Sequence, residues 1–123
     1  MNMHHAAMRV FALLVALGGC GTSPDSRPAT LETITHEVLA PSCGQVQCHS
    51  TTTRVENYAL DTVPAARESL ARLLETDDAG GIRLFDILDG IGGERMPADA
   101  PLPQADRDLL TKWYFDNNHE GVQ

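Results

Sequence analysis

Prolines and glycines divide the chain after residue 30 into short segments, and this division limits the secondary structure that it can form. Pro41 and Pro64 bracket one stretch, and three further prolines lie between residues 97 and 103. Proline lacks a backbone donor, so each helix is expected to begin or end near one of these points. Apolar residues recur between them at helical spacing, and strand signals are nearly absent. The sequence therefore predicts an all-α domain of three to four short helices with long loops.

The first predicted helix begins after Thr30, which is a favourable N-cap residue, and is expected to stop at Pro41. Three more helices are expected, at residues 65–75, 82–88 and 104–116. The side chains predicted to face the core are apolar residues of these helices: Leu31, Ile34, Val38, Leu39, Leu70, Leu73, Leu74, Leu109, Leu110, Trp113 and Tyr114.

Residues 1–20 have the pattern of an export signal. Arg9 precedes an apolar run at 10–17, which is shorter than the ~20 residues of a membrane-spanning helix. Such a run fits the core of a secretory signal, typically ~7–15 residues. The run ends in Leu-Gly-Gly-Cys20, which resembles the bacterial lipobox, so residues 1–19 are predicted to be a lipoprotein signal peptide and Cys20 to be lipidated. An ordinary signal peptide with an incidental cysteine is the alternative.

Export would place the protein on the periplasmic side of the cell envelope, an oxidising compartment. Gly21, rather than aspartate, follows the lipobox cysteine and favours the outer membrane. Residues 20–30 are rich in Pro, Ser and Thr and predict a flexible tether. Residues 31–118 would form the domain, and residues 119–123 a tail.

The charge balance bears on the partners of this chain. Its 17 acidic and 9 basic residues give a formal charge of −8, which argues against nucleic acid as a ligand. An acidic surface suits a basic docking partner or serves solubility alone. Aromatic residues make up 5% of the chain, so the core is thin and a covalent or cofactor staple would help it.

Two thiols remain after lipidation of Cys20, at Cys43 and Cys48, and His49 follows directly. This is the pattern of c-type haem attachment, in which two thioether bonds hold the haem and the adjacent imidazole binds iron. Four residues separate the cysteines instead of the usual two, and on a regular helix they would point ~140° apart. The helix must therefore bulge or unwind here, which Gly44 permits.

Two other interpretations of this segment stay open. A disulfide between Cys43 and Cys48 would close a short loop and contribute about 2 kcal/mol at most. Zinc could instead be held by the two cysteines together with His49 and His36.

Met96 is the only methionine after the leader, and it lies in a Gly- and Pro-rich loop between Arg95 and Pro97. Haem iron with histidine on one side often takes a methionine sulfur on the other. A methionine that merely fills the core is the alternative.

Residues 33–117 resemble the class I cytochrome c family, narrowly the small exported domains of the myxobacterial type. The resemblance rests on Pro-Ser-Cys43, Cys48-His49, Met96-Pro and a closing helix with Trp113. It implies a cytochrome c-like fold with its first helix packed against its last, and one covalent haem c contacted by the two cysteines, His49 and Met96.

We therefore expect a lipid-anchored periplasmic monohaem cytochrome that carries electrons to a redox partner protein and is not an enzyme. His49 and Met96 would be the axial ligands. The alternative is a haem-free lipoprotein with a Cys43–Cys48 disulfide, acting as an envelope binding or assembly module. If Met96 does not bind iron, an open site would suit a small ligand or a sensor. Tyr58 and Arg95 are candidates for contacting a haem propionate.

Overall fold

The computed structural model describes residues 25–76 and 80–117, and the secondary structure in these ranges is helical apart from an isolated bridge between Thr76 and Ile82. The elements are α1 (Leu31–Ile34), a π-helical turn η1 (Thr35–Leu39), α2 (Ala40–Ser42), a 3₁₀ turn η2 (Val55–Asn57), α3 (Val63–Leu73), α4 (Arg83–Asp89) and α5 (Gln104–Asp116). The predicted all-α class is confirmed.

The first three elements form one continuous N-terminal helix. It begins where predicted, because the Thr30 Oγ1 accepts a hydrogen bond from the Thr33 N–H at 3.2 Å. Its middle turn is π-helical, and the Ala40 N–H donates to the Thr35 carbonyl five residues back. π-Bulges are rare and frequently lie at functional sites.

Pro41 was predicted to stop this helix, but it does not do so. The helix continues to Ser42, with Pro41 inside its last turn. The Leu39 carbonyl then accepts hydrogen bonds from both Cys43 N–H, at 2.7 Å, and Gly44 N–H, at 2.8 Å. The helix therefore ends directly at the first cysteine of the Cys-His segment.

The later helices lie close to the predicted ranges. α3 has Pro64 in its first turn and begins two residues earlier than predicted. α4 ends at Gly90, whose φ of 71° is the left-handed conformation that glycine adopts freely. α5 has the predicted limits. The turn η2, in the loop after the cysteines, was not predicted.

The core is a single apolar cluster to which all of these helices contribute. Its buried members are Leu31, Ile34, Val38, Leu39, Leu60, Ala66, Leu70, Leu73, Leu84, Leu88, Leu109, Leu110, Trp113 and Tyr114. Every predicted core residue is buried except Leu74, which is half-buried.

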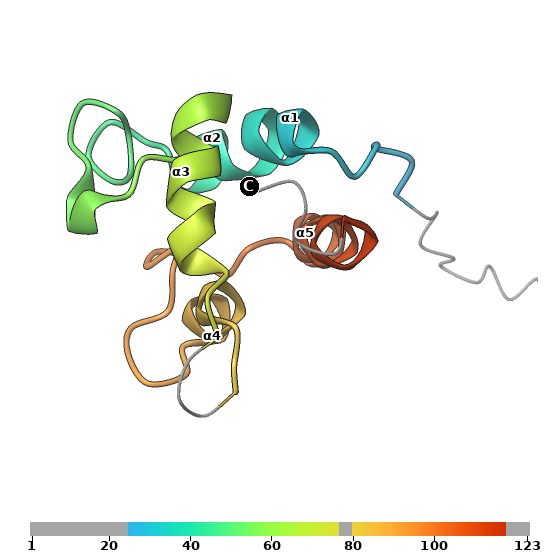
Figure 1. The fold of residues 1–123 in the computed structure, drawn as a ribbon. Coiled ribbons are helices and arrows are strands. Elements are labelled where there is room, and N and C mark those ends of the chain that lie inside the picture. Colours follow the sequence, from blue (N-terminus) through green and yellow to red (C-terminus); the bar gives the residue numbers. More distant parts are fainter. Residues whose placement is uncertain (1–24, 77–79, 118–123) are drawn as a thin grey trace, which may run out of the picture.

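Contacts between the helices enclose this cluster. α1 contacts both α3 and α5, and α3 contacts α4. In Figure 1, α3 runs between the N-terminal helix and α4, and α5 lies beside α1. The expected packing of the first helix against the last is therefore present. Within the described ranges, no helix is both long and apolar enough to cross a membrane.

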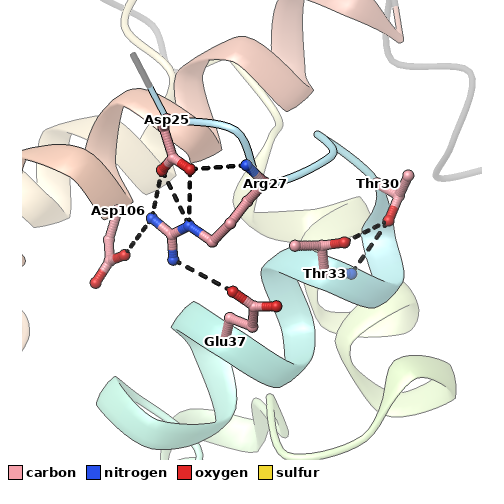
Figure 2. A network of polar contacts seen from close by, with 6 residues as sticks. All are labelled: Asp25, Arg27, Thr30, Thr33, Glu37 and Asp106. Atoms are coloured by element: carbon pink, nitrogen blue, oxygen red, sulfur yellow. Dashed lines mark hydrogen bonds and ion pairs between the residues drawn. The ribbon is translucent and has the colours of Figure 1, made fainter. Parts of the chain in front are cut away.

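The described part of the predicted tether, residues 25–30, is held on the domain. Figure 2 shows the Arg27 guanidinium among three carboxylates, at 2.6 Å from Asp25, 2.7 Å from Asp106 and 3.6 Å from Glu37. Hydrogen bonds from Arg27 lower the pKa of the Asp25 carboxyl. Through Arg27, this described part of the predicted tether contacts both the N-terminal helix and α5.

Candidate functional site

Cys43 lies at the C-terminal end of the N-terminal helix, half-buried against the core. Burial raises the pKa of its thiol from an ordinary 9.0 to about 11, and the nearby Cys48 adds a smaller effect in the same direction. The thiols of Cys43 and Cys48 are not bonded to each other. Both cysteines are half-buried residues.

The four residues between the cysteines form a tight loop and not a helical turn. The Cys48 N–H donates to the Gln45 carbonyl at 2.8 Å, and the His49 N–H donates back to the Cys43 carbonyl at 3.0 Å. The predicted unwinding of the helix is therefore present. The angular rule for residues on a helix does not apply to this cysteine pair.

Glycine at position 44 was expected because it allows the helix to unwind. The structure shows another reason, which is that no larger residue fits there. A Cβ added there would lie 2.9 Å from the Asp61 Cα and 3.0 Å from the Ala40 Cα. Real Cβ atoms essentially never approach backbone this closely, so the chain at residue 61 crosses the helix end at a distance that only glycine permits.

The His49 ring has a defined tautomer. Its Nδ1 lies 2.9 Å from the Val55 carbonyl oxygen, and because a carbonyl only accepts, Nδ1 must carry the proton. The other ring nitrogen, Nε2, then has its lone pair free to accept, and it has no hydrogen-bond partner among the described residues. Histidines that bind metals typically donate the opposite N–H to a carbonyl or carboxylate in this way.

Two backbone hydrogen bonds attach the loop of residues 50–61 to the Cys48-His49 segment. Its Val55 N–H donates to the Cys48 carbonyl at 3.3 Å, and its Leu60 N–H donates to the His49 carbonyl at 2.6 Å. Within the loop, the Asp61 carboxylate accepts from the Thr51 N–H, at 2.9 Å, and from the Thr51 hydroxyl, at 2.8 Å. Burial alone would raise the pKa of Asp61, but these bonds outweigh it and the pKa lies below its ordinary value.

The backbone around Val55 is strained. Arg54, Glu56 and Asn57 have φ values of 48°, 54° and 63°, all in the left-handed region. This conformation costs an L-residue roughly 1–2 kcal/mol, and asparagine tolerates it better than arginine or glutamate. Such strain persists only where neighbouring contacts enforce it, and it is common at functional sites.

Ser69 of α3 supplies one of those contacts. Its hydroxyl accepts from the Ala59 N–H and donates to the Ala59 carbonyl, both at 2.9 Å, and the side chain is buried. One side chain thereby satisfies both polar groups of a buried loop residue. This pair of bonds fixes the end of the loop on α3.

Tyr58 packs edge-on against His49, with ring centroids 6.0 Å apart. The Arg72 guanidinium of α3 lies 4.8 Å from the Tyr58 ring centroid and also donates to the Asn57 carbonyl at 2.7 Å. The imidazole ring therefore packs against a tyrosine that Arg72 of α3 contacts in turn.

Met96 lies in a different loop, between α4 and α5. Its N–H donates to the Ile87 carbonyl at 3.1 Å, which holds the loop on the end of α4. The side chain is half-buried and is not part of the apolar cluster formed by the described residues. The loop after α2 and the loop after α4 extend to the same side of α3 (Figure 1).

The structure thus brings Cys43, Cys48 and His49 into one loop and leaves Met96 on another. His36 is exposed on the N-terminal helix. Across residues 25–76 and 80–117, no three His, Cys, Asp or Glu side chains gather as a metal ion would require, so His36 does not join the cysteines. Cys20 lies outside the described residues.

Sequence reasoning did not single out Val55 or Ser69. Val55 acts through its carbonyl oxygen, which has no side-chain signature. Ser69 looks like any polar residue of an amphipathic helix, and only its burial reveals its partner. Comparison with known proteins found no matching family, no similar curated protein and no similar solved structure.

Proposed function

We propose that this protein is a lipid-anchored periplasmic c-type cytochrome that transfers single electrons to a redox partner. One haem would be attached through Cys43 and Cys48, with His49 and Met96 as its axial ligands. The observation that carries the proposal is the hydrogen bond from His49 Nδ1 to the Val55 carbonyl, which leaves Nε2 as an acceptor next to Cys48.

The donor set suits this group. Two unbonded thiols and an imidazole with a defined tautomer share one loop, and Met96 is half-buried outside the core. This position of Met96 argues against a core-filling role and leaves the thioether available as a ligand. When bound, haem c supplies a one-electron change at iron.

The chain's own residues would orient and shield this site. Val55 fixes the imidazole tautomer, and Tyr58 limits rotation of the ring. Val46, between the two cysteines, and Val55, in the loop of residues 50–61, are exposed apolar residues, at 69% and 39% of their full area, and a porphyrin would cover such side chains where they lie against it. The excess of acidic residues favours a basic partner.

The test is to express the protein with a cytochrome c maturation system and to record its absorption spectrum and intact mass. We expect a Soret band and a mass increase of one haem. His49→Ala should abolish normal haem ligation, whereas His36→Ala, which changes an exposed histidine, should leave the spectrum unchanged. A haem-free product whose mass shows a Cys43–Cys48 disulfide would overturn the proposal and favour the envelope-module alternative.

The anchor is tested separately. Cells grown with a palmitate analogue should label the protein, and Cys20→Ser should remove the label without changing haem content in a periplasmically secreted form. Unlabelled wild-type protein would refute lipidation.

A further inference from the structure

A pocket of about 290 Å³ lies between the end of α4 and the beginning of α5, and none of its lining residues belongs to the Cys48-His49 loop. Leu88, Pro101 and Leu102 form its apolar side. Its polar side includes two arginines, Arg95 and Arg107. The volume suits a molecule at the small end of the range that proteins bind.

Arg95 has no ion pair or hydrogen bond among the described residues, and its Nε is buried without an acceptor. An unsatisfied buried donor costs about 1–3 kcal/mol, more when it belongs to a charged group. Acidic residues are in excess in this chain, yet none of the described ones pairs with Arg95. An external acceptor that reached this nitrogen after a small movement of the side chain would remove this cost.

The other polar groups of the pocket leave it with net positive charge. Arg107 is neutralised by Asp89, with 2.8 Å between the nitrogen and oxygen. The first N–H groups of α5, at Gln104 and Ala105, have no acceptor in the described part of the chain, because Pro103 provides no side-chain cap. The positive end of the helix dipole therefore adds to the charge of Arg95.

The backbone of the Arg95 loop is fixed before any ligand binds. The Met96 N–H donates to the Ile87 carbonyl, and the Arg95 Cβ lies only 3.3 Å from the place where a Cβ on Gly90 would be. The left-handed Gly90 thus lets Arg95 pack directly over the end of α4. A guanidinium on an ordered loop loses less entropy when it binds an anion.

We propose that this pocket binds a small organic carboxylate, with the carboxylate at Arg95 and the hydrocarbon part against Leu88 and Leu102. An arginine fork matches the two oxygens of a carboxylate. The carboxylate can come from a free acid or from a propionate of the haem proposed above. The site itself does not depend on the proposed function, since a free acid would bind whether or not haem is present.

The experiment is an NMR titration of the protein with butyrate, observing the arginine Nε–H resonances in haem-free and haem-loaded protein. We expect a saturable shift of the Arg95 signal, at constant ionic strength, that chloride and inorganic phosphate do not reproduce. Binding to both forms identifies a free acid as the ligand. Binding to the haem-free form alone identifies a propionate as the occupant.

Variants test the assignment to Arg95. Arg95→Gln should raise the Kd for butyrate by at least about tenfold, as expected for a lost charge-assisted hydrogen bond. Arg95→Lys should fall between it and the wild type. Arg83→Gln removes the same charge from an exposed position on α4 and should leave the Kd within about twofold. Absence of saturation, an equal response to phosphate, or equal effects of the Arg95 and Arg83 variants would overturn the proposal.

Discussion

Replacing Gly44 with alanine tests the geometry on which the cysteine segment depends. The new Cβ would lie 2.9 Å from the Asp61 Cα and 3.0 Å from both the Asp61 N and the Ala40 Cα. These are all backbone atoms, so no flexible side chain can move aside. Overpacking of this kind costs about 1–3 kcal/mol. We expect the free energy of unfolding to fall by about 2 kcal/mol, which lowers the Tm of a domain this small by about 10 °C.

Gly93→Ala is the matched control. Nothing lies within 4 Å of a Cβ at Gly93, and its φ is not in the left-handed region. The added methyl restricts only the unfolded chain there, so stability should stay unchanged or rise by about 0.4–1 kcal/mol. Thermal and urea unfolding, followed by far-ultraviolet circular dichroism, measure both variants. A Gly44→Ala protein as stable as Gly93→Ala would refute the close approach of residue 61 to the helix end.

Three further predictions concern other parts of the chain. The haem-free protein should lose stability as pH rises from about 9 to about 11. The reason is that the raised pKa of Cys43 keeps its thiol protonated in the folded state, whereas the same thiol ionises in the unfolded chain. Urea midpoints across this pH range, compared with those of Cys43→Ser, measure the effect. Met96→Ala should change haem-free stability by less than about 1 kcal/mol, whereas Leu39→Ala in the core should cost about 2–5 kcal/mol; equal losses in urea unfolding would place Met96 in the core. Arg27→Gln should speed proteolytic cleavage before Thr30 and change global stability by only about 1 kcal/mol, since its ion pairs lie at the surface; an unchanged cleavage pattern would contradict the clamp.

The helices could be predicted because their signals are local. The Thr30 side chain caps the helix that follows it by accepting a hydrogen bond from the N–H of Thr33, three residues later. The limits of α5 follow from Pro103, which precedes it, and from the spacing of its apolar residues. The same spacing identified the core, since residues that recur every three or four positions share a helix face. Pro41 shows the limit of such rules, because the preceding π-helical turn let the helix continue past it.

The contacts that hold the ends of the domain together could not be predicted. Composition made residues 20–30 look like a tether, but Arg27 binds Asp106, which is distant in the sequence and becomes close only once α1 packs against α5. The Ser69–Ala59 bonds depend in the same way on how the loop lies over α3. Both are consequences of tertiary packing.

The wide spacing of the cysteines has a structural explanation in the loop. On a helix, four intervening residues would turn Cys48 away from Cys43, but the helix ends at Cys43 and the His49 N–H returns to the Cys43 carbonyl. The extra residues therefore close a loop instead of displacing a helix face. The strained turn around Val55 then determines which nitrogen of His49 carries the proton. In this chain the orientation of the histidine depends on a backbone carbonyl that the strained loop holds in place, so the number of residues between the cysteines is a poor guide to whether His49 can bind iron.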